Sequence, residues 1–310
     1  MGNKIYWAVY KNLEKELIDI SNIIHIDDKQ LSTYSIKIVE LLVRTAVEIE
    51  SISKDLYYAN GGTKANDNTL AFDSDCIDHL ETIWKLSSKV VRISGLNLFL
   101  TKAENIEITP LDKANKRGKC DWKKAYQAVK HSRNNNLEKG TLKNFIKALA
   151  ALFVLNLYYR DSVFNIGNDS QLKSFDSRCG SEIFSVKVNS LISITPSELI
   201  SKQGDYDQCV YIFKPTMSSG ANVQQILVEK EEKIIDEKQR LTLNKLNQYV
   251  KDGTISSYRE FNKLPKEKVL PMEMEALKEA SKAVNAEYGE RLTRAYAQLD
   301  YEVVLNKHQF

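Results

Sequence analysis

The apolar residues of this chain recur mostly at the spacing of helices. Over residues 32–58 they stand three or four positions apart, which predicts one long amphipathic helix. The same spacing predicts helices over 74–95 and from 122 to about 134, and one or two short helices over 4–24. Over 141–159 apolar residues occupy most of the helical faces, which is typical of a helix at the centre of a bundle.

The pattern changes in the second half of the chain. Residues 182–188 and 208–213 are rich in β-branched and aromatic side chains, which predicts two strands that form a short β-hairpin with a long insert. Helical spacing resumes over 222–251. A last helix is predicted from 271 to about 305, because proline suits the first position of a helix. The apolar stripes of these two helices are most simply explained as core or dimer packing.

These elements predict a mainly α protein in three parts. A helical bundle would occupy residues 1–162, a strand-containing connector residues 163–220, and a C-terminal region with two long helices residues 221–310. The composition agrees with long helices, because only 5 prolines and 12 glycines interrupt the chain.

Composition and charge narrow the class of protein. Hydrophobic residues make up 43% and charged residues 27% of the chain, which are ordinary values for a globular protein. A net charge of +3 is too small to indicate nucleic-acid binding, so any phosphate site must come from local clustering. The longest apolar run, 148–159, is too short to span a bilayer, and the N-terminus lacks the apolar segment of a signal peptide. We therefore expect a cytoplasmic protein without membrane contact.

The cysteines predict neither a metal site nor a disulfide framework. Cys76, Cys120, Cys179 and Cys209 are far apart and are expected to be reduced thiols. Cys76 and His79 have the spacing of a zinc-ligand pair, but no second pair completes a four-ligand site. We expect no metal and no cofactor.

Candidate chemistry concentrates in the segment 121–133. This segment carries four cations and one of the 4 histidines, namely Lys123, Lys124, Lys130, Arg133 and His131. On a helix, Lys124, Gln127 and His131 share one polar stripe, which Asn134 would extend. The neighbouring stripe holds Trp122, Tyr126, Val129 and Arg133. An imidazole flanked by cations suits a ligand that carries phosphate.

In metal-independent cleavage of RNA, His131 would move the proton of the ribose 2′-hydroxyl or of the leaving 5′-oxygen, since imidazole titrates near neutral pH. Lys130 and Arg133 would bind the phosphate and stabilise its extra charge in the transition state. Tyr126 and Gln127 would orient the site. Further contacts to the RNA backbone would come from Lys123, Lys124, Asn134, Lys116 and Arg117. The last two belong to a basic run for which a solvated loop is the simpler explanation.

The block Trp122-x-x-x-Tyr126-Gln-x-x-Lys130-His131-x-Arg133, with Thr141-Leu-Lys-Asn144 and the apolar helix after it, resembles the HEPN superfamily of prokaryotic helical proteins. The resemblance covers about residues 105–160. Members share an Arg-x(4–6)-His motif near a late helix of a small bundle. Many are RNases of toxin–antitoxin and anti-phage systems, and they commonly form homodimers in which two motifs face one cleft. The resemblance implies a HEPN-like bundle, an endoribonuclease that acts on RNA, and a homodimer.

Two positions depart from the family pattern. Tyr126 stands where the family has arginine, and Gln127 stands where it often has asparagine. Arg133 could replace the missing arginine only if the helix ends or distorts just after His131, because a residue two positions on points about 200° around a straight helix. The alternative function is a non-catalytic HEPN-like binding, sensor or dimerisation module that recruits a partner protein through residues 221–310.

The remaining candidates are weaker. His25 and His79 stand beside carboxylates, as surface histidines often do, and His308 lies in a terminus that is expected to fray. Asp73, Asp75 and Asp78 form an acidic cluster at the start of a predicted helix. The cluster could bind a cation, but N-capping and favourable charge at the helix start explain it better.

Overall fold

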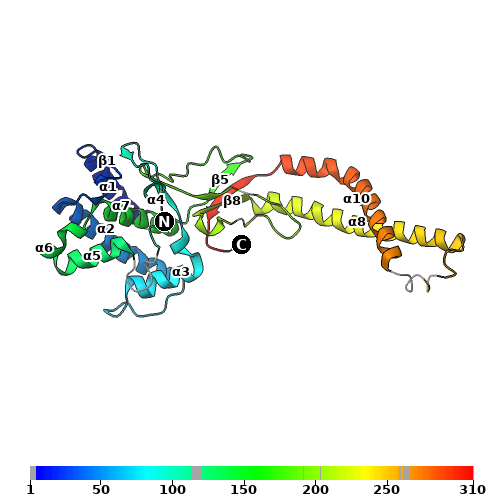
Figure 1. The fold of residues 1–310 in the computed structure, drawn as a ribbon, viewed down its shortest axis with the longest axis horizontal. Helices are drawn as coiled ribbons and strands as arrows, with labels where there is room; N and C mark the ends of the chain where they lie inside the picture. The colour runs from blue at the N-terminus through cyan, green and yellow to red at the C-terminus, as the bar shows by residue number, and fades with distance from the viewer. Residues whose placement is uncertain are drawn as a thin grey trace.

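The computed structural model describes residues 5–112, 120–190, 192–202, 204–257, 260 and 266–309. A lobe of helices stands at one end, small sheets follow it, and two long helices project from the sheets at the other end (Figure 1). The fold is mainly helical with small sheets, as the sequence predicts. The helices of the lobe are α1 (Ile5–Ser21), α2 (Ile36–Ala59), α3 (Asp78–Trp84), α4 (Ala103–Ile106), α5 (Asp121–His131), α6 (Arg133–Asn136) and α7 (Leu142–Arg160).

Helix α7 forms the centre of the lobe. Every residue from Ala148 to Tyr158 is buried, and α1, α2 and α5 all contact this helix. The hydroxyl of Thr141 accepts a hydrogen bond of 3.3 Å from the Asn144 amide, which satisfies one of the unpaired donors at the start of the helix. The central helix that the sequence predicts over 141–159 is therefore confirmed.

Helix α2 packs along α7 and also matches its prediction closely. Its N-cap is Ser35, whose hydroxyl accepts from the Ile38 amide at 3.2 Å. The segment before it is held by the amide of Leu142, which donates to the Thr33 carbonyl at 2.8 Å. The beginnings of α2 and α7 therefore lie at the same end of the lobe.

The prediction of a single helix over 74–95 is wrong. A π-helical turn, Phe72–Ile77, leads into the short helix α3, which ends at Lys85. Lys85 adopts a left-handed conformation with φ of 49° and ψ of 52°, which a continuing helix does not allow. The chain then becomes extended, and Val91–Ile93 forms strand β2 instead of a last helical turn.

The described residues form three small sheets, and the four-stranded sheet carries the long helices. Strands β1 (Ile26–Asp27) and β3 (Leu98–Phe99) form a parallel pair, and β2 lies between β4 (Glu107–Ile108) and β6 (Phe184–Val186). The largest sheet has four strands in the order β5 (Phe164–Gly167), β9 (Tyr301–Leu305), β8 (Tyr211–Pro215) and β7 (Val188–Asn189).

The strands expected near 182–188 and 208–213 form, but they are not antiparallel neighbours. β7 pairs with β8 in parallel, with Val188 opposite Tyr211. The antiparallel partner of β8 is β9, close to the C-terminus, with Phe213 opposite Val303. The residues of β9 alternate between buried and half-buried, which is the pattern of a strand. The end of the predicted helix over 271–305 is therefore strand.

The two long helices are α8 (Met217–Lys251) and α10 (Lys266–Ala297), and they pack against each other as an antiparallel pair (Figure 1). The sequence predicts both of them, although α8 begins earlier than expected, with Thr216 as its N-cap. Pro271 lies inside α10 and not at its first position. Because β8 leads into α8 and β9 follows α10, the helical pair is an insertion between two neighbouring strands.

Candidate functional site

Helix α5 carries the segment that the sequence singles out, and it is amphipathic. Trp122, Tyr126 and Val129 are buried against the lobe, and the Trp122 indole donates a hydrogen bond of 2.8 Å to the Pro110 carbonyl. Lys124 and His131 are exposed on the other side, with Gln127 half-buried between them. The structure therefore places the polar stripe of Lys124, Gln127 and His131 toward solvent.

The helix stops at His131. Ser132 has φ of −152° and ψ of 79°, which is not helical, and Arg133 begins the separate one-turn helix α6. Asn136 holds this break, because its side-chain amide donates to the carbonyls of Ala128 at 3.2 Å and Ser132 at 2.8 Å. The Ala128 carbonyl also accepts a hydrogen bond of 3.0 Å from the Ser132 amide, so Asn136 adds a second donor at the end of the helix. The straight-helix geometry that would turn Arg133 away from His131 does not apply here.

The break leaves four polar side chains exposed at one corner of the lobe. Lys130, His131, Arg133 and Asn134 are all exposed, and we call them the α5–α6 corner. In Figure 1 this corner lies at the edge of the lobe opposite the long helices. Lys130 and His131 stand in the last turn of α5, where positive charge is favoured by the helix dipole. Stabilisation of the helix end is therefore a sufficient structural role for them, beside any role in binding.

Lys130 is held in place by the residues beneath it. Its Nζ lies 5.2 Å from the centre of the Tyr126 ring and 4.0 Å from Glu50 Oε1. Its interaction with the Tyr126 hydroxyl, and then the charge of Glu50, raise the pKa of Lys130 above its usual value. Lys130 therefore stays a cation at neutral pH and can bind an anion, but it is a poor proton donor or acceptor there.

Tyr126 does not reach the solvent, so any orienting role it has is exerted from beneath the exposed residues. Its side chain is 1% exposed, and its hydroxyl donates to Glu50 Oε1 at 3.0 Å. Burial, together with the Glu50 carboxylate, raises the pKa of Tyr126. Tyr126 is therefore a core residue, and it supports the α5–α6 corner from below.

Lys123 is also inside the lobe, so the phosphate contact predicted for it is wrong. It is 5% exposed, forms an ion pair with Asp73, and has its Nζ 5.9 Å from the centre of the Phe72 ring. Asp73 comes from the π-helical turn, far away in sequence, so helical periodicity alone could not place Lys123. Two further predicted contacts, Lys116 and Arg117, lie outside the described residues.

The other histidines have structural partners. His79 Nε2 lies 2.8 Å from the Asn60 carbonyl oxygen, and His25 stacks on Phe99 with ring centres 4.6 Å apart. His308 packs edge-on against Tyr206, so the terminus that was expected to fray is held at this point. None of these arrangements resembles the exposed end of α5.

The four cysteines do not form a site either. All four are free and buried, and burial raises their pKa values to about 11 or about 12, so they are not reactive nucleophiles. Among the residues that the structure describes, no group of three or more His, Cys, Asp or Glu side chains is arranged to hold a metal ion. No described helix is long and apolar enough to cross a membrane.

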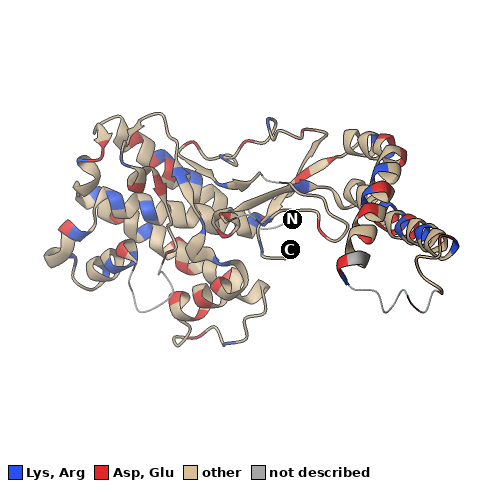
Figure 2. Ribbon diagram, turned by 45° about the vertical axis from the view of Figure 1, so that its right-hand side comes forward, with Lys and Arg blue, Asp and Glu red and all other residues tan. Residues whose placement is uncertain are grey.

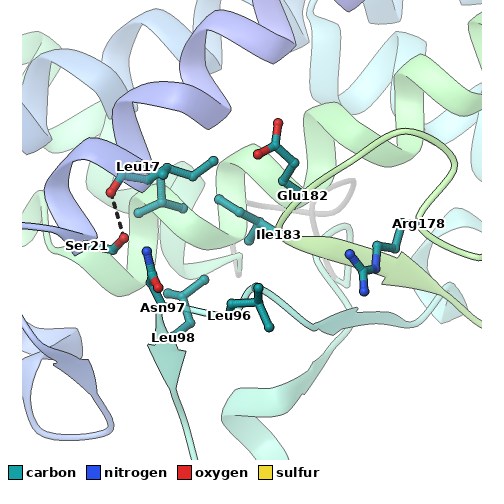
Figure 3. Close-up of a pocket in the computed structure, with 10 residues that line it drawn as sticks. Leu17, Ser21, Leu96, Asn97, Leu98, Arg178, Glu182 and Ile183 are labelled. Atoms are coloured by element: carbon teal, nitrogen blue, oxygen red, sulfur yellow. Dashed lines mark hydrogen bonds between the residues drawn. The ribbon is translucent and has the colours of Figure 1, made fainter.

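A pocket of about 250 Å³ lies elsewhere, between α1 and two loops (Figure 3). Leu17, Leu98 and Ile183 give it apolar walls, while Arg178 and Glu182 are its charged residues. The residues that line it within the described chain include no histidine and no cysteine. Sequence periodicity could not have found this pocket, because its walls come from three separate segments.

The comparisons with known proteins add no relative. No family model matches the chain, and neither the curated proteins nor the solved structures contain a significant match. The chemistry of the α5–α6 corner therefore has to be inferred from its own residues.

Proposed function

We propose that the protein is a HEPN-like, metal-independent ribonuclease, a toxin or an effector of anti-phage defence, and that its active centre is the α5–α6 corner. One observation carries the proposal: α5 ends at His131, so an imidazole and the cations Lys130 and Arg133 are exposed on consecutive short elements. This is the condition under which Arg133 can serve in place of the arginine that Tyr126 replaces.

In the proposed reaction, neutral His131 takes the proton of a ribose 2′-hydroxyl. The 2′-oxygen then attacks the adjacent phosphorus, the bond from phosphorus to the 5′-oxygen breaks, and a 2′,3′-cyclic phosphate remains. The leaving 5′-oxygen takes a proton from water or from a second imidazole. Lys130 and Arg133 bind the phosphate oxygens and stabilise the added negative charge, while Asn134 donates a neutral hydrogen bond.

The test is cleavage of labelled RNA by the purified full chain in the presence of a metal chelator. We expect His131→Ala to lower the rate by about 10²-fold or more, because it removes the proton-transfer group. The matched control is His25→Ala, which removes another exposed histidine, the one stacked on Phe99. Arg133→Ala should weaken cleavage, and Arg133→Lys should restore part of it. Equal rates for His131→Ala and wild type would exclude this active centre.

A second function is favoured by the burial of Tyr126. If the core position of Tyr126 marks a lost catalytic arginine, the lobe is a binding or sensor module, and the long helices recruit a partner protein. In that case wild type would bind RNA or another ligand at the α5–α6 corner without cleaving RNA. The growth of cells that express wild type and His131→Ala separates the two functions, since only the ribonuclease predicts toxicity that depends on His131.

A further inference from the structure

A pocket of about 380 Å³ lies at the end of the lobe where α2 and α7 begin. Three separate segments each supply one lysine to it: Lys29 follows β1, Lys102 precedes α4, and Lys143 stands in the first turn of α7. All three lysines are exposed, and we call this site the lysine pocket. Both kinds of charge occur throughout the lobe (Figure 2), so a site for an anion has to be identified from the groups that line it.

The three lysines are not neutralised by the protein. None of them forms an ion pair with a described residue, whereas Lys147, one turn further along α7, lies 3.4 Å from Asp121 Oδ2. Lys143 also stands at the positive end of the α7 dipole, where a cation is disfavoured, and the first turn of α7 contains no acidic residue. An anion in the pocket would therefore stabilise both the lysines and the helix end.

Two carboxylates also line the pocket, and they limit the charge that it can bind. Asp28 accepts hydrogen bonds from the Thr101 hydroxyl at 2.7 Å, the Thr101 amide at 3.0 Å and the Asn105 side chain at 2.7 Å. These hydrogen bonds, first the one from the Thr101 hydroxyl, lower the pKa of Asp28 to about 2. Glu104 is exposed. Three cations against two carboxylates leave one net positive charge, which matches a single phosphodiester better than the several charges of a pyrophosphate.

An exposed aromatic ring lies beside the lysine pocket. Tyr34 is 49% exposed, and its backbone forms an isolated antiparallel bridge with Thr141, which lines the pocket. The Tyr34 side chain makes no hydrogen bond or aromatic contact with a described residue. Proteins that bind single strands stack bases on such rings, because every unpaired base offers a flat face. A phosphate site with an aromatic ring beside it fits one nucleotide of a single strand.

The pocket also lies close to the α5–α6 corner. Asn136 holds the end of α5, and residues 136–141 span at most about 18 Å even when fully extended. The Asn144 side chain donates to the Lys139 carbonyl at 2.8 Å, which ties this connection to the first turn of α7. Consecutive phosphates of a stacked strand are about 3.4 Å apart along its axis, so a strand of a few nucleotides can reach both places.

We propose that the lysine pocket binds one phosphodiester of the RNA strand, and that Tyr34 stacks on an unpaired base next to it. This inference deepens the proposed function and rests on it for the identity of the strand. The α5–α6 corner acts on the reacting phosphate, and the lysine pocket binds a second phosphate that holds the strand in register. The substrate is therefore single-stranded where it crosses the beginnings of α2 and α7.

The first test is the affinity of the full chain for a labelled 2′-O-methyl oligonucleotide, which has no free 2′-hydroxyl and cannot undergo the proposed cleavage. Fluorescence anisotropy at several salt concentrations gives Kd and its salt dependence. The triple variant Lys29→Gln, Lys102→Gln and Lys143→Gln should raise Kd by about tenfold or more. The slope of log K against log salt should become shallower by about 0.7, the value for one phosphate of a single strand.

The matched control is the triple variant Lys233→Gln, Lys278→Gln and Lys282→Gln, which removes the same charge from exposed positions on α8 and α10. It should keep the affinity and the slope of wild type. No binding by wild type, or equal affinity and slope for the pocket variant and wild type, would overturn the proposal. An equal loss in both triple variants would also overturn it, because the loss would then reflect net charge.

The second test uses the same oligonucleotide with variants of Tyr34. Tyr34→Ala should raise Kd by about tenfold and leave the salt slope unchanged, because stacking releases no counterions. Tyr34→Phe should bind like wild type, because it keeps the ring. Tyr296→Ala is the control, since Tyr296 is 42% exposed but lies on α10. Wild-type affinity in Tyr34→Ala, or equally weak binding by Tyr34→Phe, would contradict the stacking.

The outcomes separate this inference from the proposed function. If the pocket variant loses affinity but wild type does not cleave RNA, the inference stands and the lobe is a binding module. If wild type cleaves RNA but the pocket variant binds as tightly as wild type, the inference fails and the cleavage stands. Inorganic phosphate should displace the oligonucleotide no better than chloride at equal ionic strength. Displacement at a low phosphate concentration would assign the pocket to free phosphate and overturn the proposal.

Discussion

The hydroxyl of Tyr126 on α5 donates a 3.0 Å hydrogen bond to Glu50 Oε1 on α2. The same carboxylate lies 4.0 Å from Lys130 Nζ, so a core contact and an exposed cation share one acceptor. Tyr126 therefore belongs to the support of the α5–α6 corner and not to its reactive surface.

Substitution of Tyr126 should change stability more than it changes chemistry. Tyr126→Phe should lower the free energy of unfolding by about 1 kcal/mol, because the hydrogen bond to Glu50 is lost. Tyr126→Arg should cost about 3 kcal/mol or more, because it buries a charge in a packed site. Urea unfolding measures both. The control Tyr58→Phe removes a 2.8 Å hydrogen bond to Lys64 at an exposed position and should have a smaller effect. A stable Tyr126→Arg variant would show that this position is not a core position.

Glu14 should make the protein sensitive to acid. Its carboxylate is fully buried and accepts hydrogen bonds from Tyr10 at 2.8 Å, from the Glu182 amide at 2.9 Å, and from Ser181. Burial raises the pKa of Glu14, but the hydrogen bonds, first those from Lys11 and Ser181, outweigh it and lower the pKa below 4.5. Its contribution is therefore complete above the unfolded value of 4.5 and is lost as pH falls through the lower folded value.

The variant Glu14→Gln tests this dependence. We expect it to cost about 2 to 4 kcal/mol at neutral pH and to make stability less dependent on pH in the acidic range. Glu16→Gln is the control, because Glu16 forms a 2.8 Å ion pair with Lys37 near the surface. Urea unfolding at neutral pH and at about pH 4 gives the difference. An acid transition of the same size in Glu14→Gln and wild type would show that other carboxylates control it.

Lys89 should make stability depend on pH in alkaline solution, in the same direction as Glu14 does in acid. Its side chain is fully buried and donates to the carbonyls of Asp207 at 3.0 Å and Cys209 at 3.1 Å. Burial lowers the pKa of Lys89 from 10.5 to about 8. Between these values the unfolded chain binds more protons, so the free energy of unfolding should rise with pH, by about 2 kcal/mol from about pH 7.5 to about pH 9.5.

Lys89→Met should remove this rise, because methionine does not titrate. Lys85→Met is the matched control, since Lys85 is exposed and forms a 2.7 Å ion pair with Asp207. Urea unfolding at the two pH values measures the slope. If Lys89→Met keeps the slope of wild type, the buried ammonium is not its source.

The four thiols should be unreactive in the folded protein. Burial raises the pKa of Cys179 to about 12 and those of the other three cysteines to about 11. A thiol reagent at about pH 8 should therefore modify none of them rapidly, because the thiolate is the reactive form. The same reagent in denaturant should modify all four. One fast equivalent in the native protein would identify a cysteine that is exposed or opens easily.

The sequence predicts an element well where its periodicity and its capping residue are local. Helix α7 is an example, because its apolar faces and Thr141 are both visible in the chain. The prediction of one helix over 74–95 was wrong because Lys85 ends α3 in a left-handed conformation and Val91–Ile93 pairs with β4 and β6, which lie elsewhere in the sequence. Strand β9 was missed because its five residues form a strand only beside β8 and β5, which lie far away in sequence.

In the candidate site, too, the sequence predicts local features but not contacts between distant segments. The sequence locates the segment, and a helical wheel turns Lys124 and His131 outward, as the structure has them. The burial of Lys123 could not be predicted from the local sequence, because its carboxylate partner Asp73 comes from another segment. The end of α5 at His131 had a local signal in the asparagine run that follows, because Asn136 is the residue that caps it.

Helices α8 and α10 are inserted between β8 and β9. The length of this helical pair can therefore change without a change in the rest of the fold. Ser219 Oγ lies 2.9 Å from the Asp300 carbonyl oxygen, so the two ends of the insertion are joined at the sheet whatever the distance to the tip. Two helical turns added to both helices, or removed from both, would preserve the facing of their apolar residues and change the reach by about 10 Å. Variants with longer or shorter projecting helices would thus keep the same attachment to the sheet.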